Sequence, residues 1–361
     1  MFKNKLILLT LITVVVVVAA SIFVKLRAPQ SEKDKPLFFP ELAGQIESVN
    51  HISIENYAGS VNLTRIDDFW TIDEFDSYPA LPDKVKSTVL GAADLRINAP
   101  KTALPRLYHR LGVEGPGKHE ESTSLLLTIK DTSSNDIIKV ILGKPRLSSA
   151  SQSSPGLYVR KPDDERSYLV DGVMDITAVK TDWIERSLFD IPKEAIKSVR
   201  IVHTDGDTFT LLKNEKGQEH FQLQNLPFGK KIAPEIIINK FGTILQDVQI
   251  NGARSKEKLQ APEKTISAQI ITFEAIIVDI IAFELDGIPY ASFEFKFDDA
   301  FIPEAEQQFK ADDVKASIEN LNARTSNWWF EIQEFKYDEL KKRSDNVIRD
   351  DSTNFVEQEV K

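Results

Sequence analysis

One short stretch occurs twice in the chain and constrains its architecture more than any other feature. The first copy is Asp94–Asn98, with the sequence Asp-Leu-Arg-Ile-Asn, and the second is Asp247–Asn251, with the sequence Asp-Val-Gln-Ile-Asn. Each copy closes a helix-like segment that follows several strand-like stretches. A match at a fixed period indicates duplication of a whole structural unit. We therefore predict two copies of one fold.

Shorter matches lie in the same order upstream of each copy. They pair Ile46–Val49 with Ile196–Val199, Leu63–Arg65 with Leu211–Lys213, and Trp70–Ile72 with Phe221–Leu223. The predicted helices begin near Asp83 and near Pro234, and we expect the second helix to run to Ile250. Chance similarity between two β-rich stretches is the alternative, and the conserved order of the matches favours duplication.

The strand and helix patterns predict an α+β fold class, with each repeat forming an antiparallel sheet covered by a helix. Leu95 and Ile97 alternate about Arg96, so we expect both apolar side chains to be buried and Arg96 to face solvent, with Gln249 as its counterpart. The other residues expected in the two cores are Trp70, Ile72, Val85 and Val89 in the first repeat and Phe221, Leu223, Ile237 or Ile238, Phe241, Val248 and Ile250 in the second.

The N-terminus predicts a transmembrane helix. Leu6–Val24 is a run of nineteen residues without a charge, preceded by Lys3 and Lys5. A membrane-spanning helix needs about 20 apolar residues. A cleaved signal peptide is the alternative, because Val18–Ala20 resembles a cleavage site. The apolar run continues past that site to Val24, which favours an uncleaved anchor with the body outside the cytoplasmic membrane.

These features divide the chain into five segments. We predict a membrane anchor at 1–27, a proline-containing linker at 28–44, the first repeat at 45–192, the second repeat at 193–349 and a disordered polar tail at 350–361. The apolar stretch Ser267–Phe297 is interrupted by Glu274, Asp279 and Glu284, so a second membrane crossing is not expected. Asp286-Gly287 within this stretch indicates a tight hairpin turn instead.

Composition excludes several classes of function. The net charge is −10 and is spread along the chain, which argues against nucleic acid as a partner because phosphate binding needs a clustered basic face. The chain has no cysteine, which excludes disulfides, thiolate catalysis, zinc–thiolate sites and iron–sulfur clusters.

The remaining residues match no catalytic or metal-binding pattern. The five histidines are His51, His109, His119, His203 and His220, and no pair has the spacing of metal ligands. The cluster His203–Asp207 is interpreted as a strand end entering an Asp-Gly turn rather than as a metal site. Gly143–Pro145 lacks the upstream glycine of a phosphate-binding loop. We therefore predict no enzymatic activity, no metal and no cofactor.

Two kinds of exposed-looking feature remain. The acidic pairs Asp163-Asp164 and Asp298-Asp299 are interpreted as solvated turns, because adjacent strand residues point to opposite faces. The neighbours Trp328 and Trp329 are candidate partner-facing residues, since tryptophan is common in interface hot spots. The alternative places one of the two tryptophans in the core and the other at its rim.

Several motifs together resemble the family called domain of unknown function 4340. They are Tyr78–Ala80, Leu95–Ile97, Pro100–Thr102, Leu107–Tyr108, Leu111–Val113, Gly156–Arg160, Tyr168–Asp171 and Asp182–Ile184. The resemblance covers the first repeat well and the second more loosely, and it carries over no catalytic residues. Proteins similar to this are bacterial and membrane-anchored, and their genes often neighbour an ABC-type permease and an auxiliary subunit akin to those named for gliding motility.

The resemblance implies a non-enzymatic accessory protein of an ABC-type envelope transport system. We expect a single-pass protein of the bacterial inner membrane, anchored through residues 6–24, with its C-terminal body in the periplasm and with permease and auxiliary subunits as possible partners. The alternative is an envelope lipid- or glycan-binding module that holds its ligand between the repeats, suggested by the apolar stretch Ser267–Phe297. An unrecognised hydrolase is the third and weakest hypothesis.

Overall fold

A computed structural model describes residues 16, 18, 35–117, 122–146, 155–301 and 310–350. The predicted anchor at 6–24 and the predicted tail beyond 350 therefore lie outside the described residues, apart from Val16 and Val18. Within the described part of the chain, no helix is both long and apolar enough to cross a membrane.

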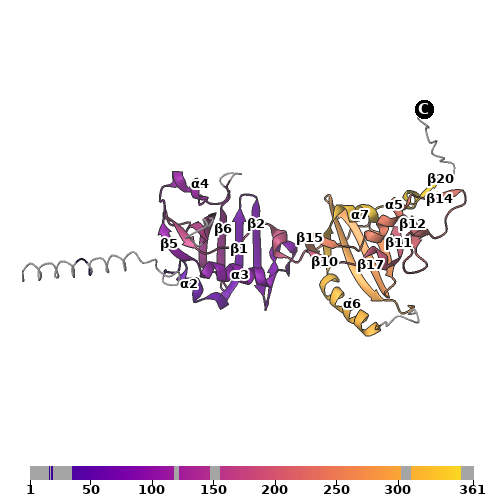
Figure 1. Cartoon of the computed structure of the whole chain (residues 1–361), viewed down its shortest axis with the longest axis horizontal. Coiled ribbons are helices and arrows are strands. Elements are labelled where there is room, and N and C mark those ends of the chain that lie inside the picture. Colours follow the sequence, from indigo (N-terminus) through magenta and orange to yellow (C-terminus); the bar gives the residue numbers. More distant parts are fainter. Residues whose placement is uncertain are drawn as a thin grey trace, which may run out of the picture. The chain divides into compact units, whose positions relative to one another are not determined.

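The fold is rich in β-structure, with two large antiparallel sheets and few helices (Figure 1). The chain divides into two compact units, each described here by itself. Unit 1 consists of residues 1–60 and 86–178, and unit 2 consists of residues 61–85 and 179–361.

The first sheet has nine strands in the order β4-β3-β2-β1-β6-β7-β8-β9-β5. The strands are β1 (Val49–Asn56), β2 (Gly59–Ile66), β3 (Phe69–Ile72), β4 (Tyr78–Pro79), β5 (Arg96–Pro100), β6 (Leu125–Asp131), β7 (Asp136–Arg146), β8 (Gly156–Arg160) and β9 (Ser167–Asp171). The helices in this part of the chain are α2 (Pro40–Ala43), η2 (Ile46–Ser48), η3 (Asp73–Phe75), α3 (Pro82–Ala93), η4 (Pro105–Leu107) and α4 (Tyr108–Leu111).

The second sheet also has nine strands, in the order β10-β15-β19-β18-β17-β16-β11-β12-β13. The strands are β10 (Ser187–Phe189), β11 (Ile196–His203), β12 (Thr208–Leu212), β13 (Gln222–Leu223), β15 (Val248–Ser255), β16 (Ile266–Thr272), β17 (Ile276–Leu285), β18 (Ile288–Phe297) and β19 (Trp328–Ile332). A separate pair joins β14 (Lys230–Ile232) to β20 (Ile348–Asp350). The helices are η5 (Lys180–Trp183), η6 (Lys193–Ala195), α5 (Glu235–Ile238), η7 (Asn239–Thr243), α6 (Ala311–Thr325), α7 (Glu334–Leu340) and η8 (Ser344–Asn346).

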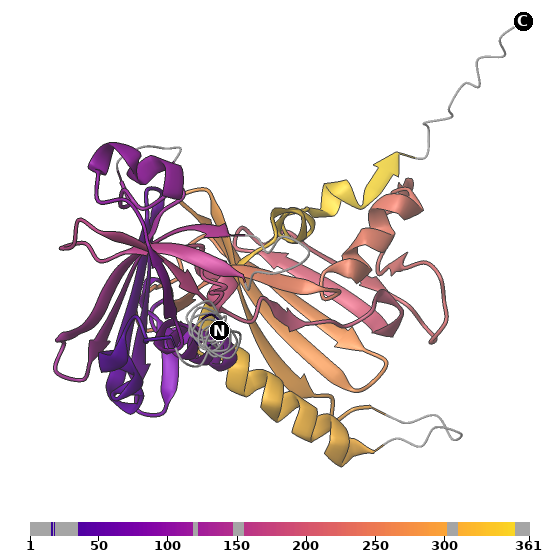
Figure 2. The same cartoon turned by 60° about the vertical axis from the view of Figure 1, so that its left-hand side comes forward.

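Alternation along the strands places one apolar face of each sheet in a core. In β11, Val199 and Ile201 are fully buried, whereas Arg200 between them is exposed. The short helix η7 packs on this core face, with the rings of Phe241 and Phe209 5.3 Å apart and edge to face. Helix α6 lies beside β18, where Asn322 bonds to the backbone of Phe295 (Figure 2). The opposite face of β11 is therefore left free to carry polar side chains.

The repeated asparagines lie at equivalent irregularities of the two sheets. In the pairing of β5 with β9 the register shifts between Ile97 and Ala99, so Asn98 is skipped. In the pairing of β15 with β19 the shift falls between Ile250 and Gly252, so Asn251 is skipped. A residue skipped in this way forms a β-bulge, which bends the strand.

Both bulge asparagines bind a charged side chain. Asn98 donates a hydrogen bond of 2.6 Å to the carboxylate of Asp171, and Asn251 accepts one of 3.0 Å from Arg186. These contacts explain why the final residue of the repeated stretch is polar, because its exposed side chain binds a charged group in both copies.

The structure corrects several local predictions. Ile97 is half-buried rather than buried, and Arg96 donates a hydrogen bond of 2.9 Å to the carbonyl oxygen of Lys35 instead of facing solvent alone. The predicted helix at 234–250 is reduced to α5 and η7, because β15 already begins at Val248. Of the other expected core residues, Trp70 and Leu223 are half-buried.

Part of the segment assigned to a linker packs on unit 1. Phe39 and Leu42 are fully buried, and Phe38 donates its backbone N–H to the carbonyl oxygen of Leu95 at 2.7 Å. Lys35 forms an ion pair with Asp171. Residues 35–43 therefore belong to the packed body of unit 1.

Candidate functional site

The turn between β11 and β12 holds the last described part of the chain. Asp207 accepts hydrogen bonds from the backbone N–H and the hydroxyl of Ser344, at 3.1 and 2.5 Å. Arg343 forms ion pairs with Asp205 and Asp207, and the ring nitrogen Nε2 of His203 lies 2.9 Å from the carbonyl oxygen of Lys342. The cluster His203–Asp207 is thus a clamp for residues 341–350, which we call the C-terminal arm.

Electrostatics reinforce this clamp. The hydrogen bond from Arg343 holds the pKa of the Asp205 carboxyl below its ordinary value. Burial alone would raise the pKa of Asp207, but the hydrogen bonds from Ser344 outweigh it and lower that pKa. Both carboxylates are therefore ionised, and competent to hold the arm, at neutral pH.

The other end of the arm is held by the β14–β20 pair. Lys231 lies opposite Arg349 in this pairing, and Lys230 forms an ion pair of 2.6 Å with Asp350. The backbone N–H of Ala233 donates to the carbonyl oxygen of Val347 at 2.9 Å. The arm is therefore attached at both ends and forms a wall beside the sheet.

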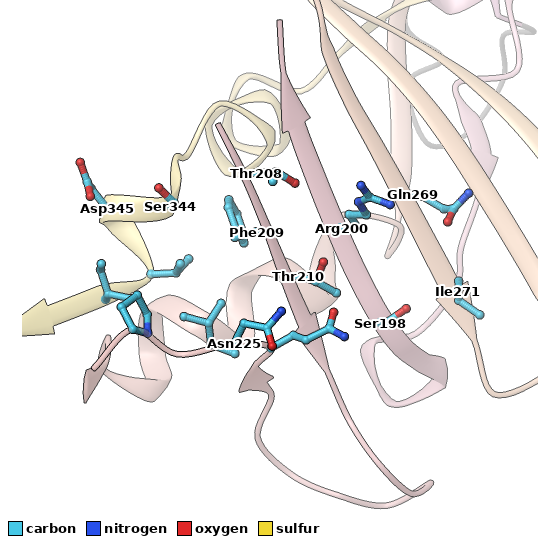
Figure 3. Close-up of a pocket in the computed structure, with 15 residues that line it drawn as sticks. Ser198, Arg200, Thr208, Phe209, Thr210, Asn225, Gln269, Ile271, Ser344 and Asp345 are labelled. Atoms are coloured by element: carbon cyan, nitrogen blue, oxygen red, sulfur yellow. The ribbon is translucent and has the colours of Figure 1, made fainter. Parts of the chain in front are cut away.

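A groove of about 650 Å³ lies between the arm and the solvent face of β12, β11 and β16 (Figure 3). Its floor contains a row of polar side chains, because Arg200 pairs across the strands with Thr210 on one side and Gln269 on the other. Its walls are the segment that contains Asn225 and the arm at Ser344 and Asp345. The volume falls within the usual range of small-molecule sites.

Arg200 is the one cationic side chain that lines the groove among the described residues, and Asp345 is the one acidic side chain. The side chain of Arg200 is exposed and makes no hydrogen bond or ion pair within the described part of the chain. Gln269 is fixed by a hydrogen bond of 2.9 Å to Asp279, which in turn pairs with Lys296. The groove therefore offers a free guanidinium, suited to a carboxylate or phosphate, beside an ordered amide.

The two candidate partner-facing tryptophans differ in environment. Trp329 is 7% exposed, packs in a cluster with Phe283 and Tyr290, and donates its ring N–H to the carbonyl oxygen of Leu259 at 2.9 Å. Trp328 is half-buried, and its ring meets that of Tyr78 edge to face at 5.0 Å. A partner-facing role for the pair stays a prediction.

The acidic pairs lie in turns. Asp164 accepts the backbone N–H of Arg166 at 2.8 Å, and Asp298 accepts that of Ala300 at 3.0 Å. No group of three or more histidine, aspartate or glutamate side chains within the described ranges is arranged to hold a metal ion. Gly143 lies within β7, where an added Cβ would meet the carbonyl oxygen of Leu111 at 2.3 Å, so this glycine permits close packing.

The sequence analysis did not identify the groove. The alternation that buries Val199 and Ile201 could have marked Arg200 as an outward-facing cation. The wall at Ser344 and Asp345 has no such signal in the sequence, because it depends on a contact between Ser344 and the distant residue Asp207.

The fold and the groove define a class: an α+β protein built on two nine-stranded antiparallel sheets, with a ligand-sized groove on the second. Residues 70–265, more than half of the chain, match the family model described as Domain of unknown function (DUF4340), and the chain belongs to this family. No curated protein and no solved structure matches the chain.

Proposed function

We propose that this chain is a non-enzymatic accessory protein of an ABC-type envelope transport system. In this proposal residues 6–24 anchor it in the inner membrane and the body lies in the periplasm. The groove beside the C-terminal arm supports a binding role, because it presents the unpaired guanidinium of Arg200 on an otherwise ordered polar floor. The link to a permease and auxiliary subunits rests on the family resemblance.

We also propose that the two sheets arose by duplication. Starting from β3, the first sheet runs β3-β2-β1-β6-β7-β8-β9-β5, and starting from β13, the second runs β13-β12-β11-β16-β17-β18-β19-β15. The successive strands of the two lists correspond one to one in chain order. The bulges at Asn98 and Asn251 fall on corresponding strands, which further supports the proposal.

The structure changes the register of one sequence match. Ile46–Ser48 forms η2 ahead of β1, whereas Ile196–Ser198 opens β11. The buried residues Ile52 and Ile54 of β1 correspond to Val199 and Ile201 of β11, so this match is three residues out of step with the strands. The matches at Leu63 and Ile72 agree with the pairing of Leu63 with Ile72 and of Leu211 with Leu223.

Affinity purification of the full-length, detergent-solubilised protein tests the accessory role. We expect permease or auxiliary subunits to co-purify with the wild type and with Arg110→Gln, which removes an exposed arginine outside the groove. Arg200→Gln removes the guanidinium from the groove floor and is expected to reduce recovery of these subunits. Equal recovery with both variants would exclude the groove as the contact, and absence of transport subunits from the wild type would contradict the accessory role.

A lipid- or glycan-binding module is the second candidate function. The groove combines polar floor residues with apolar wall residues such as Pro227 and Ile348, which suits an amphiphilic ligand with one anionic group. In contrast to the sequence hypothesis, this ligand would occupy unit 2 alone. Native mass spectrometry of the detergent-solubilised chain should then detect a bound lipid or glycan in the wild type and lose it in Arg200→Gln.

A further inference from the structure

A second hollow, of about 520 Å³, lies in unit 1 between the short helices η4 and α4 and the turn from β8 to β9. Its lining includes Arg106, Tyr108, Glu114, Arg160 and the acidic turn residues 163–165. It shares no lining residue with the groove of unit 2.

Arg160 is only 8% exposed, yet all its hydrogen bonds within the described residues go to neutral carbonyl oxygens. Its Nε donates to Val113 at 2.9 Å, and its Nη1 lies within 3.3 Å of the carbonyl oxygens of Lys161, Pro162 and Asp164. No carboxylate of the described residues forms an ion pair with it, although a buried arginine is ordinarily paired with an anion.

The Nη2 group of Arg160 is the part of the guanidinium left for a ligand. It donates no hydrogen bond within the described part of the chain, while Nε and Nη1 are occupied. The plane of the guanidinium lies over the ring of Tyr108, 4.5 Å from its centroid, and the Tyr108 hydroxyl donates to the carbonyl oxygen of Glu165 at 2.5 Å. These contacts fix the direction in which Nη2 points, so the donor is preorganised.

The same hollow contains an uncompensated negative group. Glu114 is half-buried, and its Oε2 atom is buried without a hydrogen-bond partner among the residues that the structure describes. Burying a carboxylate oxygen costs free energy when it loses its hydration and accepts no hydrogen bond in return. A nearby cation reduces this cost. Glu114 therefore favours an ammonium group within the hollow.

The charged side chains that line the hollow disfavour ligands that carry only a positive or only a negative charge. An anion at Arg160 also meets the carboxylates of Glu114 and of residues 163–165, whereas a cation at Glu114 also meets the guanidinium groups of Arg106 and Arg160. A ligand that carries both charges satisfies both sides, because each of its ends faces a group of opposite sign.

We propose that this hollow binds a small zwitterion, whose carboxylate accepts a hydrogen bond from Arg160 Nη2 and whose ammonium group lies beside Glu114. The proposal depends on the geometry of unit 1 alone and is independent of the function proposed for the groove of unit 2. The ligand class is that of a free α-amino acid or of another small molecule that carries a carboxylate and an ammonium on the same carbon.

Three related probes separate the two charges. L-alanine carries both, N-acetyl-L-alanine carries the carboxylate alone, and L-alanine methyl ester carries the ammonium alone. Binding to the full-length, detergent-solubilised protein would be measured by saturation-transfer NMR titration. We expect alanine to bind at least about tenfold more tightly than either single-charge probe, since loss of a hydrogen bond to a charged group costs roughly 1.5–3 kcal/mol. Equal affinity for the three probes, or no binding of alanine, would overturn the proposal.

Glu114→Gln is the decisive variant, because it removes the negative charge without changing the size of the side chain. It should bring the affinity for alanine down to that for N-acetyl-L-alanine while leaving the melting temperature unchanged or higher. Glu55→Gln, at an exposed position of β1, is the matched control and should bind like the wild type. A Glu114→Gln protein that binds like Glu55→Gln would also refute the proposal. Arg160→Gln is less informative because Arg160 also holds the β8–β9 turn.

Discussion

The ammonium group of Lys336 donates a hydrogen bond of 2.8 Å to the carbonyl oxygen of Thr243, the last residue of η7. Lys336 is 4% exposed, and its Nζ atom also bonds to the carbonyl oxygen of Gln246. A buried lysine thus satisfies backbone acceptors at the end of a helix, where cations are favourable. Burial nevertheless lowers the pKa of Lys336 to about 8.

This lowered pKa predicts a stability change at alkaline pH. The pKa in the folded chain lies below that in the unfolded chain, so between pH 8 and about 10.4 the unfolded chain binds more protons. The contribution of Lys336 to the free energy of unfolding should therefore rise with pH across this window. Urea unfolding at pH 7, 8, 9 and 10 would compare the wild type with Lys336→Met, which cannot titrate. A difference between the two proteins that stays constant with pH would contradict the prediction.

The two isoleucines of the repeated stretch should differ in their contribution to stability. Ile250 is fully buried, so Ile250→Ala should lower the free energy of unfolding by about 2–5 kcal/mol. Ile97 is half-buried, so Ile97→Ala should cost less. Chemical unfolding of the two variants measures both values. A larger loss of unfolding free energy in Ile97→Ala than in Ile250→Ala would contradict the prediction, because burial would then not determine the cost of the substitution.

Arg96 should contribute more to the free energy of unfolding than an ordinary surface residue does. Its guanidinium binds the carbonyl oxygen of Lys35 and so helps to hold the segment that precedes α2. Arg96→Ala should lower the free energy of unfolding by about 1 kcal/mol, the usual net value of a hydrogen bond. Arg110→Ala, at an exposed position without such a bond, is the matched control and should stay within about 0.5 kcal/mol of the wild type.

The hydrogen bonds of the clamp predict that a substitution of Asp207 loosens the C-terminal arm locally. Asp207→Ala removes the acceptor of both hydrogen bonds from Ser344. Asp205→Ala removes an exposed partner of Arg343 and the acceptor of the Asp207 backbone N–H, but leaves both bonds from Ser344 in place. Hydrogen exchange at the backbone amides of the C-terminal arm should accelerate strongly in Asp207→Ala and weakly in Asp205→Ala. Exchange in β17 should remain unchanged in both variants, because this strand pairs with β16 and β18 rather than with β11 or β12. Unchanged exchange in the arm of Asp207→Ala would show that other contacts hold it.

The topology of the chain is also testable. A reporter that is active only in the periplasm should be active when fused after Lys361, and a cytoplasmic reporter should be silent at the same position. Mass spectrometry of the purified protein should find residues 1–27 retained. The reverse reporter pattern would refute the proposed orientation, and a mature N-terminus at Ser21 would show that the apolar run is a cleaved signal.

The alternation of apolar and polar residues predicts the strands, because it indicates which side chains can be buried. The hairpin at Asp286-Gly287 is an example: both residues have positive φ, as a tight turn between long strands requires. The turn at Ala275 escaped prediction, because alanine rarely adopts the positive φ of 63° that it has there. The helix expected at 234–250 is short because its apolar residues pack as a brief turn on the sheet, a tertiary effect that periodicity does not contain.

The two hollows could not be predicted because each depends on residues distant in the chain. The floor at Arg200 becomes part of a groove only where the distant arm near Ser344, which Asp207 holds, supplies a wall. Arg160 is buried and charged, and only the structure shows that its hydrogen-bond partners among the described residues are carbonyl oxygens rather than carboxylates. No characteristic spacing in the sequence indicates that the residues lining each hollow come together.

The alternation along β11 has an evolutionary consequence. Val199 and Ile201 hold the core together, while Arg200 between them faces the groove. Folding constrains substitutions at the inward positions, whereas under the proposed binding role the outward positions are free to change with the ligand. Descendants of one ancestral sheet can therefore diverge in ligand preference through alternate residues of a single strand, without losing the scaffold they inherit.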